Sequence, residues 1–194
     1  MKNIEIEIRI FIENDTVLRD WLKHQATFVG NKYQHDIYFE PKQTPFILID
    51  ENGFKDADEW LRIRVYADSG ELCYKKWHRD PKTRQSLYAD EVEVKIDSVE
   101  NLKLLLGYLG YNQISEVKKN RESWSYGNFL IEKDEIENLG VFYEIEFKGD
   151  VNNHQEGIEQ IYSLLKNIGI KDWKIIDRGY PWMQWNENWH KMMK

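Results

Sequence analysis

Strict alternation of charged and apolar residues is the feature of this sequence that most constrains its fold. In residues 3–12 every even position holds isoleucine, while Glu5, Glu7 and Arg9 lie between them. Successive side chains of a β-strand point to opposite faces of a sheet, so this segment predicts a strand with one apolar and one charged face. The same alternation predicts strands at 60–66, 71–77, 90–96 and 141–148, and less regular strands at 34–39, 117–124 and 128–134.

Three helices are predicted between these strands because apolar side chains recur there at helical spacing; they span residues 15–26, 98–109 and 155–168. Each is followed by a glycine that we expect to cap the helix in the left-handed conformation, namely Gly30, Gly110 and Gly169. Asp97 and Glu100 have the spacing of a capping box at the start of the second helix. Tryptophans at helical spacing predict a C-terminal docking helix within 181–194. We find no linker composition and therefore expect a single domain spanning 1–194.

The charged residues of the predicted strands are sorted by sign. Those that share a face within one strand are Glu5, Glu7 and Arg9; Arg62 and Arg64; Glu91, Glu93 and Lys95; Lys119 and Arg121; and Glu144 and Glu146. A two-layer domain would accommodate them if helices covered the apolar face and the charges faced water. Charges spread at random over a wet face would not sort into such pairs. We therefore expect an α+β fold with a closed antiparallel eight-stranded β-barrel, whose interior is polar and charged and whose helices pack outside.

Charges inside a barrel would need partners or ligands, because an unpaired buried ion costs several kcal/mol. Carboxylates gathered near one mouth repel one another unless a cation lies among them, and oxygen ligands favour Mg²⁺ or Mn²⁺. Arginine and lysine side chains on facing strands would then bind phosphate oxygens. The net charge is −7, so no overall basic field attracts nucleic acid or an anionic membrane. These features predict a small polyphosphate as the ligand.

Short motifs recur in a fixed order along the chain. They are Glu-Ile-Glu-Ile-Arg at 5–9, His-Asp-Ile-Tyr-Phe at 35–39, Trp-Leu-Arg-Ile-Arg at 60–64, Leu-Cys-Tyr-Lys at 72–75, Glu-Val-Glu at 91–93, Lys-Asn-Arg-Glu-Ser-Trp at 119–124, Asp-Glu-Ile at 134–136 and Leu-Gly-Val-Phe-Tyr-Glu-Ile-Glu at 139–146. In this order they resemble the motifs of the CYTH family, also called triphosphate tunnel metalloenzymes, and most closely its class IV adenylyl cyclase-like branch. The resemblance covers about residues 1–180. It implies a tunnel fold that binds a triphosphate together with Mg²⁺ or Mn²⁺.

The resemblance also implies roles for individual residues. Glu5, Glu7 and Glu144 match metal ligands, with Glu146 as a helper. The residues that match the phosphate-binding set are Arg62, Arg64, Lys75, Lys119 and Arg121, to which Arg9 adds its charge in place of a signature lysine. Asp134 matches an acidic residue near a second metal or the nucleophile, and we group it with Glu91 and Glu93 as candidate catalytic residues. A second departure is Lys76-Trp77, where the family usually has Gly-Pro.

The reaction that the resemblance implies is that of a class IV adenylyl cyclase. The ribose 3′-hydroxyl of bound ATP attacks the α-phosphorus, and cyclic AMP and pyrophosphate are formed. The same residues would also serve a triphosphatase that hydrolyses tripolyphosphate, thiamine triphosphate or a nucleoside triphosphate. A non-catalytic polyphosphate-binding module and a scaffold domain with solvated sheets are further alternatives.

The remaining expectations concern location and partners. Cys73 is the only cysteine, and the N-terminus lacks a signal-peptide pattern, so we expect a cytoplasmic protein. The histidines lack zinc-ligand spacing, and the sequence contains no Walker loop or Gly-x-Gly-x-x-Gly motif. We expect a small-molecule triphosphate as partner, without nucleic acid or membrane, and a homodimer stays open.

Overall fold

The computed structural model describes residues 6–66, 69–80 and 86–193 of an α+β protein. The chain forms two compact units. The described residues of unit 1 lie in 6–33, 119–177 and 190–193, and those of unit 2 lie in 34–118 and 178–189. Each unit contains its own part of the charged strands and its own helices. Among the described residues, none of the helices has both the length and the apolar character needed to cross a bilayer.

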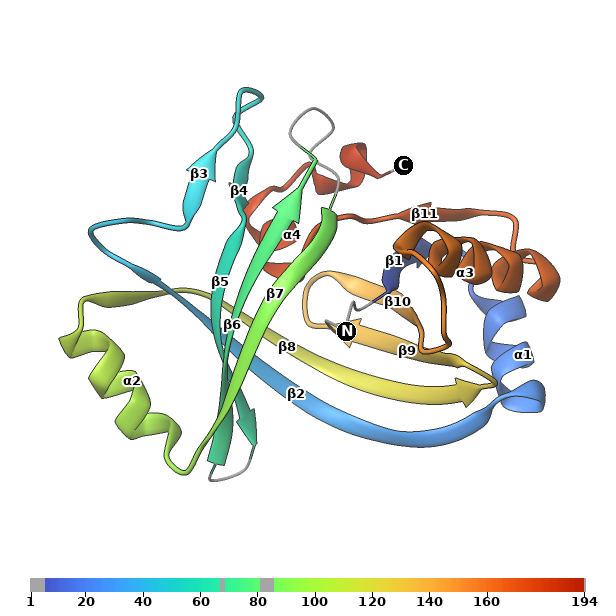
Figure 1. Ribbon diagram of the computed structural model, residues 1–194, viewed down its shortest axis with the longest axis horizontal. Coiled ribbons are helices and arrows are strands. Elements are labelled where there is room, and N and C mark those ends of the chain that lie inside the picture. The colour runs from blue at the N-terminus through green and yellow to red at the C-terminus, as the bar shows by residue number, and fades with distance from the viewer. Residues whose placement is uncertain (1–5, 67–68, 81–85, 194) are drawn as a thin grey trace. The chain divides into compact units, whose positions relative to one another are not determined.

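The strands account for most of the ordered structure. Their bounds are β1 Glu7–Ile12, β2 Thr27–Pro41, β3 Ile47–Ile49, β4 Lys55–Ala57, β5 Glu59–Tyr66, β6 Ser69–Arg79, β7 Ser86–Ile96, β8 Tyr111–Tyr126, β9 Phe129–Ile136, β10 Gly140–Phe147 and β11 Trp173–Ile175. Nine of them form one sheet in the order β11-β1-β10-β9-β8-β2-β5-β6-β7, and β3 pairs with β4 in a separate two-stranded sheet (Figure 1). The long strands β2 and β8 each have residues in both units.

The predicted closed eight-stranded barrel is wrong, because the nine-stranded sheet is open. Its edges among the described residues are β11 and β7. β1 pairs with β10 over Glu7–Ile10 on one side and with β11 over Ile10–Ile12 on the other, so both sides of β1 are paired at Ile10. Alternation reports which face a side chain occupies but not which strand lies alongside, so the sequence pattern could not distinguish an open sheet from a closed one.

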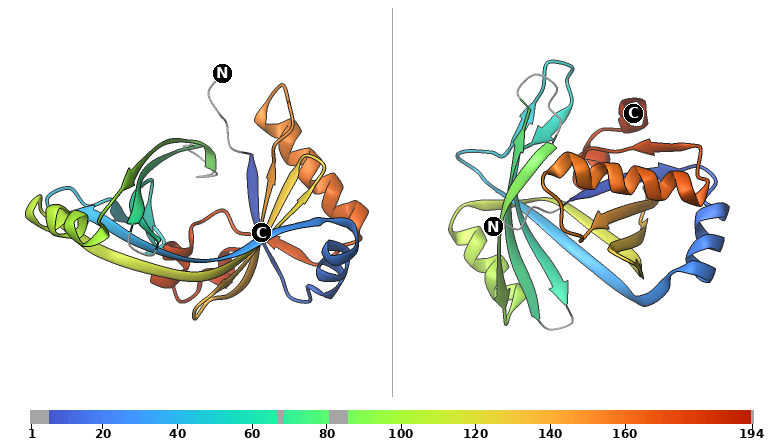
Figure 2. Two further views of the ribbon diagram at one scale, coloured as in Figure 1. Left: turned by 90° about the horizontal axis from the view of Figure 1, so that it is seen from below. Right: turned by 45° about the vertical axis from the view of Figure 1, so that its right-hand side comes forward.

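Two helices cover the apolar face of the unit 1 strands, as Figure 2 shows. They are α1, Thr16–Gln25, and α3, His154–Ile168. Their apolar stripes pack on the even-numbered isoleucines of β1 and on Ile131 and Ile145 of the neighbouring strands. α3 ends at Gly169 with a φ of 88°, as expected for a left-handed cap. The expected cap at Gly30 is wrong: α1 ends at Gln25, and Gly30 lies inside β2.

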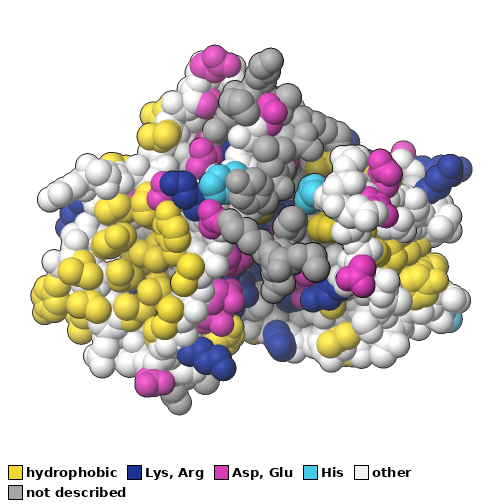
Figure 3. Space-filling view, in the orientation of Figure 1, with side chains coloured by type: hydrophobic (Ala, Val, Ile, Leu, Met, Phe, Trp, Pro, Cys, Tyr) yellow, Lys and Arg dark blue, Asp and Glu magenta, His cyan; other side chains and the backbone are white. Residues whose placement is uncertain are grey.

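Unit 2 is built around α2, Val99–Tyr108, which packs on β2 and β5. Its N-cap is Ser98, whose hydroxyl accepts from the Asn101 amide, so the cap lies one residue beyond the predicted Asp97. The outward residues of α2 stay exposed, and hydrophobic side chains gather over this helix in Figure 3; they include Leu104, Leu105, Tyr108 and Leu109.

The C-terminal segment forms two short helices where one helix within 181–194 was predicted. α4 spans Tyr180–Trp185 and a 3₁₀ helix spans Trp189–Met192. Trp182 stacks on Phe54 with ring centroids 5.7 Å apart, and Trp185 stacks on Trp60 at 5.4 Å. Aromatic stacking therefore holds α4 against the other segments of unit 2.

Close packing at Gly157 of α3 predicts a difference between two helical glycines. A Cβ at Gly157 would lie 2.7 Å from methyl groups of Ile6, whereas a Cβ at Gly107 of α2 would have no neighbour within 4 Å. Both Gly→Ala changes improve helix propensity, but overpacking at Gly157 costs about 1–3 kcal/mol. We expect urea unfolding to find Gly157→Ala less stable than Gly107→Ala by that margin. Equal stability of the two variants would contradict the packing of α3 on Ile6, the residue before β1.

Candidate functional site

The first charged cluster lies on the face of unit 1 that is opposite the helix-covered core. Strand pairing places Arg9 opposite Glu144 and Arg121 opposite Asp134, while Glu7 lies opposite Glu146. The members of this cluster, taken from β1, β8, β9 and β10, are Glu7, Arg9, Lys119, Arg121, Glu132, Asp134, Glu144 and Glu146. The alternation of β1 thus sends its isoleucines to the core and Glu7 and Arg9 to this cluster.

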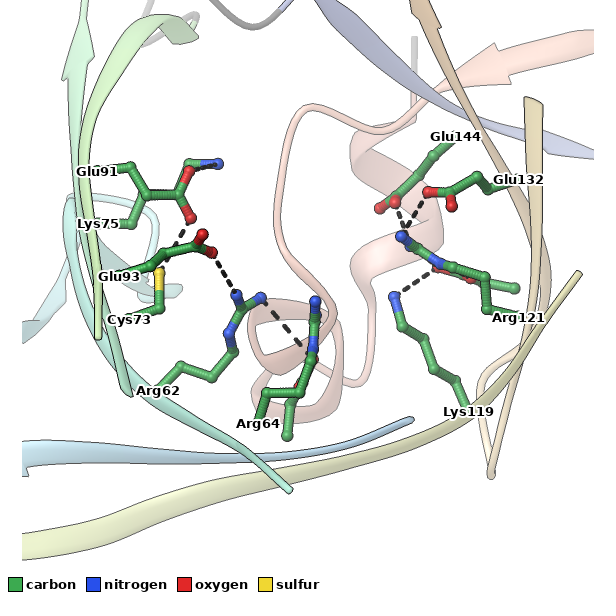
Figure 4. A network of polar contacts seen from close by, with 12 residues as sticks. Arg62, Arg64, Cys73, Lys75, Glu91, Glu93, Lys119, Arg121, Glu132 and Glu144 are labelled. Carbon is green, nitrogen blue, oxygen red and sulfur yellow. Dashed lines mark hydrogen bonds and ion pairs between the residues drawn. The ribbon is translucent and has the colours of Figure 1, made fainter. Parts of the chain in front are cut away.

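Arg121 is the centre of the first charged cluster (Figure 4). Its Nε donates to Asp134 Oδ1 at 2.6 Å, and its Nη2 donates to Asp134 Oδ2 at 2.5 Å. Its Nη1 reaches Glu132 Oε2 at 2.5 Å, and Nη2 also donates to Glu144 Oε2. Burial alone would lower the pKa of Arg121, but the charges of Glu144, Asp134 and Glu132 raise it. The guanidinium therefore stays charged and ties three carboxylates together.

Glu144 is a buried carboxylate that stays ionised. Its side chain accepts from Arg9 Nε at 2.9 Å and from Arg121, and the residue is 7% exposed. Burial by itself would raise the pKa of Glu144, yet Arg121, Arg9 and Lys119 hold it well below its ordinary value. An ionised oxygen donor is thus maintained in a part of the protein with little access to water.

Asp134 and Lys119 form a buried ion pair next to Glu144. Lys119 Nζ lies 2.7 Å from Asp134 Oδ2, and the two residues are 5% and 0% exposed. Because both oxygens of Asp134 accept from Arg121 and one also accepts from Lys119, this carboxylate holds two cations in place. A buried pair of this kind fixes side-chain geometry and is costly to break.

Glu132 belongs to the first charged cluster but was not among the residues predicted from the sequence. In addition to Arg121, it accepts a hydrogen bond from Ser123 Oγ at 3.0 Å. Burial raises the pKa of Glu132, and the nearby Glu144 adds to this, while Arg121 opposes it. The signal was present in the sequence, because Glu132 is two residues before Asp134 and therefore shares its face of the strand.

The second charged cluster lies in unit 2, on β2, β5, β6 and β7. Cross-strand pairing sets Arg62 opposite Cys73 and Cys73 opposite Glu93, and it sets Lys75 opposite Glu91. The members of this cluster are Asp36, Arg62, Arg64, Cys73, Lys75, Glu91 and Glu93. α2 covers the opposite, apolar face of these strands through Ile37, Phe39 and Ile63.

Asp36 organises the arginines of the second charged cluster. Arg64 binds it with two bonds, from Nε to Oδ1 at 2.8 Å and from Nη2 to Oδ2 at 2.9 Å. Arg62 Nη1 lies 3.8 Å from Asp36 Oδ2, and its Nη2 lies 3.8 Å from Glu93 Oε1. The sequence motif at 35–39 contained Asp36, which is 2% exposed, but its role in orienting the arginines was missed.

Cys73, Glu91 and Glu93 bring one potential ligand atom each to within 4.8 Å of one another. The Cys73 thiol donates to Glu91 Oε1 at 3.0 Å, and burial raises the pKa of Cys73 to about 12. The Cys73 thiol is therefore neutral near pH 7. Burial would raise the pKa of Glu91, but Lys75 and the Cys73 hydrogen bond lower it, so Glu91 remains ionised.

The structure brings most of the predicted site residues into these two charged clusters. Arg9, Lys119, Arg121, Asp134 and Glu144 are joined by ion pairs in unit 1. Ion pairs in unit 2 join Arg62 to Glu93 and Lys75 to Glu91, while Arg64 is paired with Asp36. Glu7 and Glu146 lie on the charged face, and Glu146 Oε2 is 3.0 Å from Lys148 Nζ. Glu5 falls outside the described residues.

The donors of the first charged cluster suit a hard divalent cation. Among the described residues, five carboxylates (Glu7, Glu132, Asp134, Glu144 and Glu146) face four cations (Arg9, Lys119, Arg121, and Lys148 beside Glu146), which leaves a formal charge of −1. Glu7 and Glu146 are directly opposite, an arrangement that is unfavourable for like charges. Carboxylate oxygens are the ligands that Mg²⁺ and Mn²⁺ prefer, so a divalent cation fits both the composition and the charge of this cluster.

A family model and several known proteins match this chain over nearly its whole length. The model of the CYTH domain family matches residues 3–180. A Methanocaldococcus jannaschii protein, whose name describes it as a candidate adenylate cyclase, is 31% identical over 181 residues, which cover 91% of this chain and 96% of that protein. A solved protein of Pyrococcus horikoshii OT3 is 26% identical with a TM-score of 0.74, covering 94% of this chain and 99% of the other.

A third protein has a similar fold at lower identity. It is a candidate adenylyl cyclase from Hippeastrum, described as having a dominant triphosphatase activity. It is 19% identical with a TM-score of 0.61, and 91% of each chain is covered. The ordered motifs, the two charged clusters and the match over residues 3–180 agree, and the chain belongs to the CYTH domain family.

Proposed function

We propose that this protein is a divalent-cation-dependent enzyme that acts on a small-molecule triphosphate, converting ATP to cyclic AMP and pyrophosphate. The CYTH family is metal-dependent in general, and the M. jannaschii relative carries an adenylate cyclase name. The single observation that carries the proposal is the first charged cluster, in which the ionised, buried Glu144 lies among carboxylates that outnumber their cations.

In this proposal Glu144 binds the cation together with Glu7 and Glu146, which share its face of the sheet. A bound divalent cation would neutralise charge that develops on the phosphate oxygens. The surrounding residues keep the donors in place: Arg9 and Arg121 hold the Glu144 carboxylate, and Asp134 in turn fixes Arg121. Asp134 acts here by positioning cations, because both of its oxygens already accept hydrogen bonds.

Within each charged cluster, taken by itself, the permanent cations are assigned to phosphate oxygens. Arg62 and Arg64 are restrained by Asp36, and Lys119 is restrained by Asp134, so little side-chain freedom remains to be lost on binding. Arginine stays charged at any physiological pH and donates to phosphate with two parallel bonds. Preorganised cations of this kind stabilise a developing charge without reorganising.

A base is needed to accept the proton of the attacking hydroxyl group. Glu93 fits this role better than Glu91, because burial and nearby carboxylates raise the pKa of Glu93 toward the working pH. Despite burial, Lys75 and Cys73 lower the pKa of Glu91, and they already engage both of its oxygens. We assign proton acceptance to the Glu93 carboxylate. A carboxylate that orients a water molecule in the same way would give hydrolysis, so the second candidate function is a triphosphatase.

The products separate these functions. We would incubate the protein with ATP, thiamine triphosphate or tripolyphosphate, with Mg²⁺ or Mn²⁺, and separate the products by ion-exchange chromatography. Cyclic AMP with pyrophosphate identifies the cyclase, and release of inorganic phosphate identifies the triphosphatase. Binding of tripolyphosphate without any product would instead identify a binding module and end the proposal of an enzyme.

A further inference from the structure

Strand β6 extends the charged face of unit 2 beyond Lys75. Cys73 is paired with Arg62, so Lys75 and Trp77, two and four residues further along, point to the same face. Trp77 lies opposite Ala89 of β7, in the register that precedes the irregularity between His78 and Arg79. The sequence therefore places a large aromatic ring next to an ammonium group assigned to phosphate binding.

The Lys75 ammonium lies between a carboxylate and an aromatic ring. Its Nζ is 3.2 Å from Glu91 Oε2 and 4.7 Å from the ring centroid of Trp77. The π-face of tryptophan attracts a cation more strongly than that of any other side chain, and it does so without adding a negative charge. The ring thus restrains a long, flexible side chain and leaves its positive charge available to an anionic ligand.

Trp77 is itself fixed by its neighbours. Its backbone amide donates to the Asp58 carbonyl at 2.8 Å. The Arg79 guanidinium lies 6.0 Å from the Trp77 ring centroid, and Arg79 Nε lies 2.8 Å from Asp58 Oδ1. The Arg79 side chain is only 3% exposed. Asp58 therefore fixes the backbone of Trp77, and the buried Arg79 side chain lies near its indole ring.

We propose that Trp77 is a positioning residue that holds the Lys75 ammonium where it binds a phosphate oxygen of the triphosphate. This inference rests on the proposed function, because it requires Lys75 to bind phosphate. The inference goes beyond the proposed function because it gives a role to Trp77, a residue at which this chain departs from the Gly-Pro usual in the family. The role is indirect: Trp77 acts through Lys75, not through contact with the reacting atoms.

The experiment is a double-mutant cycle on Trp77 and Lys75, read as the dissociation constant of tripolyphosphate by calorimetry with Mg²⁺ present. Trp77→Leu keeps apolar volume but removes the π-face, and we expect binding to weaken by about 2- to 30-fold. Trp77→Phe should recover part of the loss. In the Lys75→Met background, Trp77→Leu should have little further effect, because the coupled partner is gone. Tyr108→Leu on α2, which removes an aromatic ring that is 86% exposed, is the matched control and should bind as the wild type does.

The outcomes separate the inference from the proposed function. If Lys75→Met binds tripolyphosphate as tightly as the wild type, the phosphate role of Lys75 fails and the proposed function is weakened with it. If Lys75→Met weakens binding but Trp77→Leu costs the same factor in both backgrounds, the positioning role of Trp77 is overturned. Should Trp77→Leu not fold, the same cycle with Trp77→Phe decides the question, since a phenyl ring attracts an ammonium less strongly than indole does.

Discussion

Glu144→Gln is expected to lower cation-dependent turnover of the triphosphate by at least about 100-fold. Loss of a residue that merely supports a metal ligand costs about 10- to 100-fold, and Glu144 is proposed to contact the cation directly. Glutamine keeps the size of the side chain but removes the charge that Arg9 and Arg121 hold in its ionised form. Initial rates at saturating Mg²⁺ measure the effect. Glu135→Gln, an exposed carboxylate on β9, is the control and should retain wild-type rates.

Without a divalent cation, Glu144→Gln should bind tripolyphosphate more tightly than the wild type does. In the wild type, Arg9 and Arg121 are both engaged by Glu144, so their charge is partly neutralised. Removing that carboxylate charge should strengthen cation-free binding of tripolyphosphate by about fivefold or more, because one unit charge about 4 Å away is worth ~1 kcal/mol even in water. Calorimetry in EDTA measures this. Full activity of Glu144→Gln, or cation-free binding weaker than in the wild type, would contradict the assignment.

Arg121→Met is expected to cause the largest loss of stability, about 3–5 kcal/mol in the free energy of unfolding near pH 7. The change would leave Asp134, Glu132 and Glu144 close together without the guanidinium that joins them. Removing one partner of a buried ion pair leaves an uncompensated charge, which is far more costly than losing a surface pair. Urea unfolding measures the loss. Arg19→Met is the control, because the Arg19 side chain is 48% exposed and its ion pair with Asp15 should contribute less than about 1 kcal/mol.

The loss of stability caused by Arg121→Met should depend on pH. The pKa of Glu144 in the folded protein lies well below its ordinary value of 4.5, so its ionised form stabilises the fold above that pH. This contribution disappears as the pH falls from about 4.5 through the lower folded pKa. The difference between Arg121→Met and the wild type should therefore be largest near neutrality and should shrink in acid. A difference that is constant from pH 7 down to pH 3, or no greater than that of Arg19→Met, would show that the first charged cluster contributes no such coupling.

The alternation of single strands could be predicted from the sequence with useful accuracy. The period-two pattern of β1 correctly separated Ile8 and Ile10, which are buried in the core, from Arg9, which joins the first charged cluster. It did so because strand geometry alone fixes which face a side chain occupies. The order of motifs similarly identified the family, since each motif keeps its own spacing irrespective of how strands pair.

Closure of the sheet could not be predicted because it depends on contacts between distant segments. The three residues of β11, Trp173–Ile175, have no alternating pattern long enough to be recognised, yet they pair with β1 over Ile10–Ile12. The sequence also does not show which charged side chains form ion pairs with one another. The sequence does not specify the partners of Asp36 and Glu132, and only the side-chain hydrogen bonds show that they contact Arg64 and Arg121.

Local conformations were missed for a different reason. Asp97 and Ser98 both have side chains suited to a helix N-cap, and the choice of Ser98 depends on the backbone angles at which α2 begins. Gly30 was assigned to a helix end because glycine permits a left-handed conformation. The pairing of β2 into the sheet begins earlier, at Thr27, and this tertiary preference outweighs the local one.

The most direct test of the central claim, cation-dependent cleavage of a triphosphate, is a ³¹P NMR time course of ATP with the wild-type protein and Mg²⁺. The account predicts that the three nucleotide phosphorus signals give way to those of cyclic AMP and pyrophosphate, and that addition of EDTA stops the conversion. If the ATP signals persist unchanged with both Mg²⁺ and Mn²⁺, and tripolyphosphate and thiamine triphosphate persist as well, the proposed activity is contradicted.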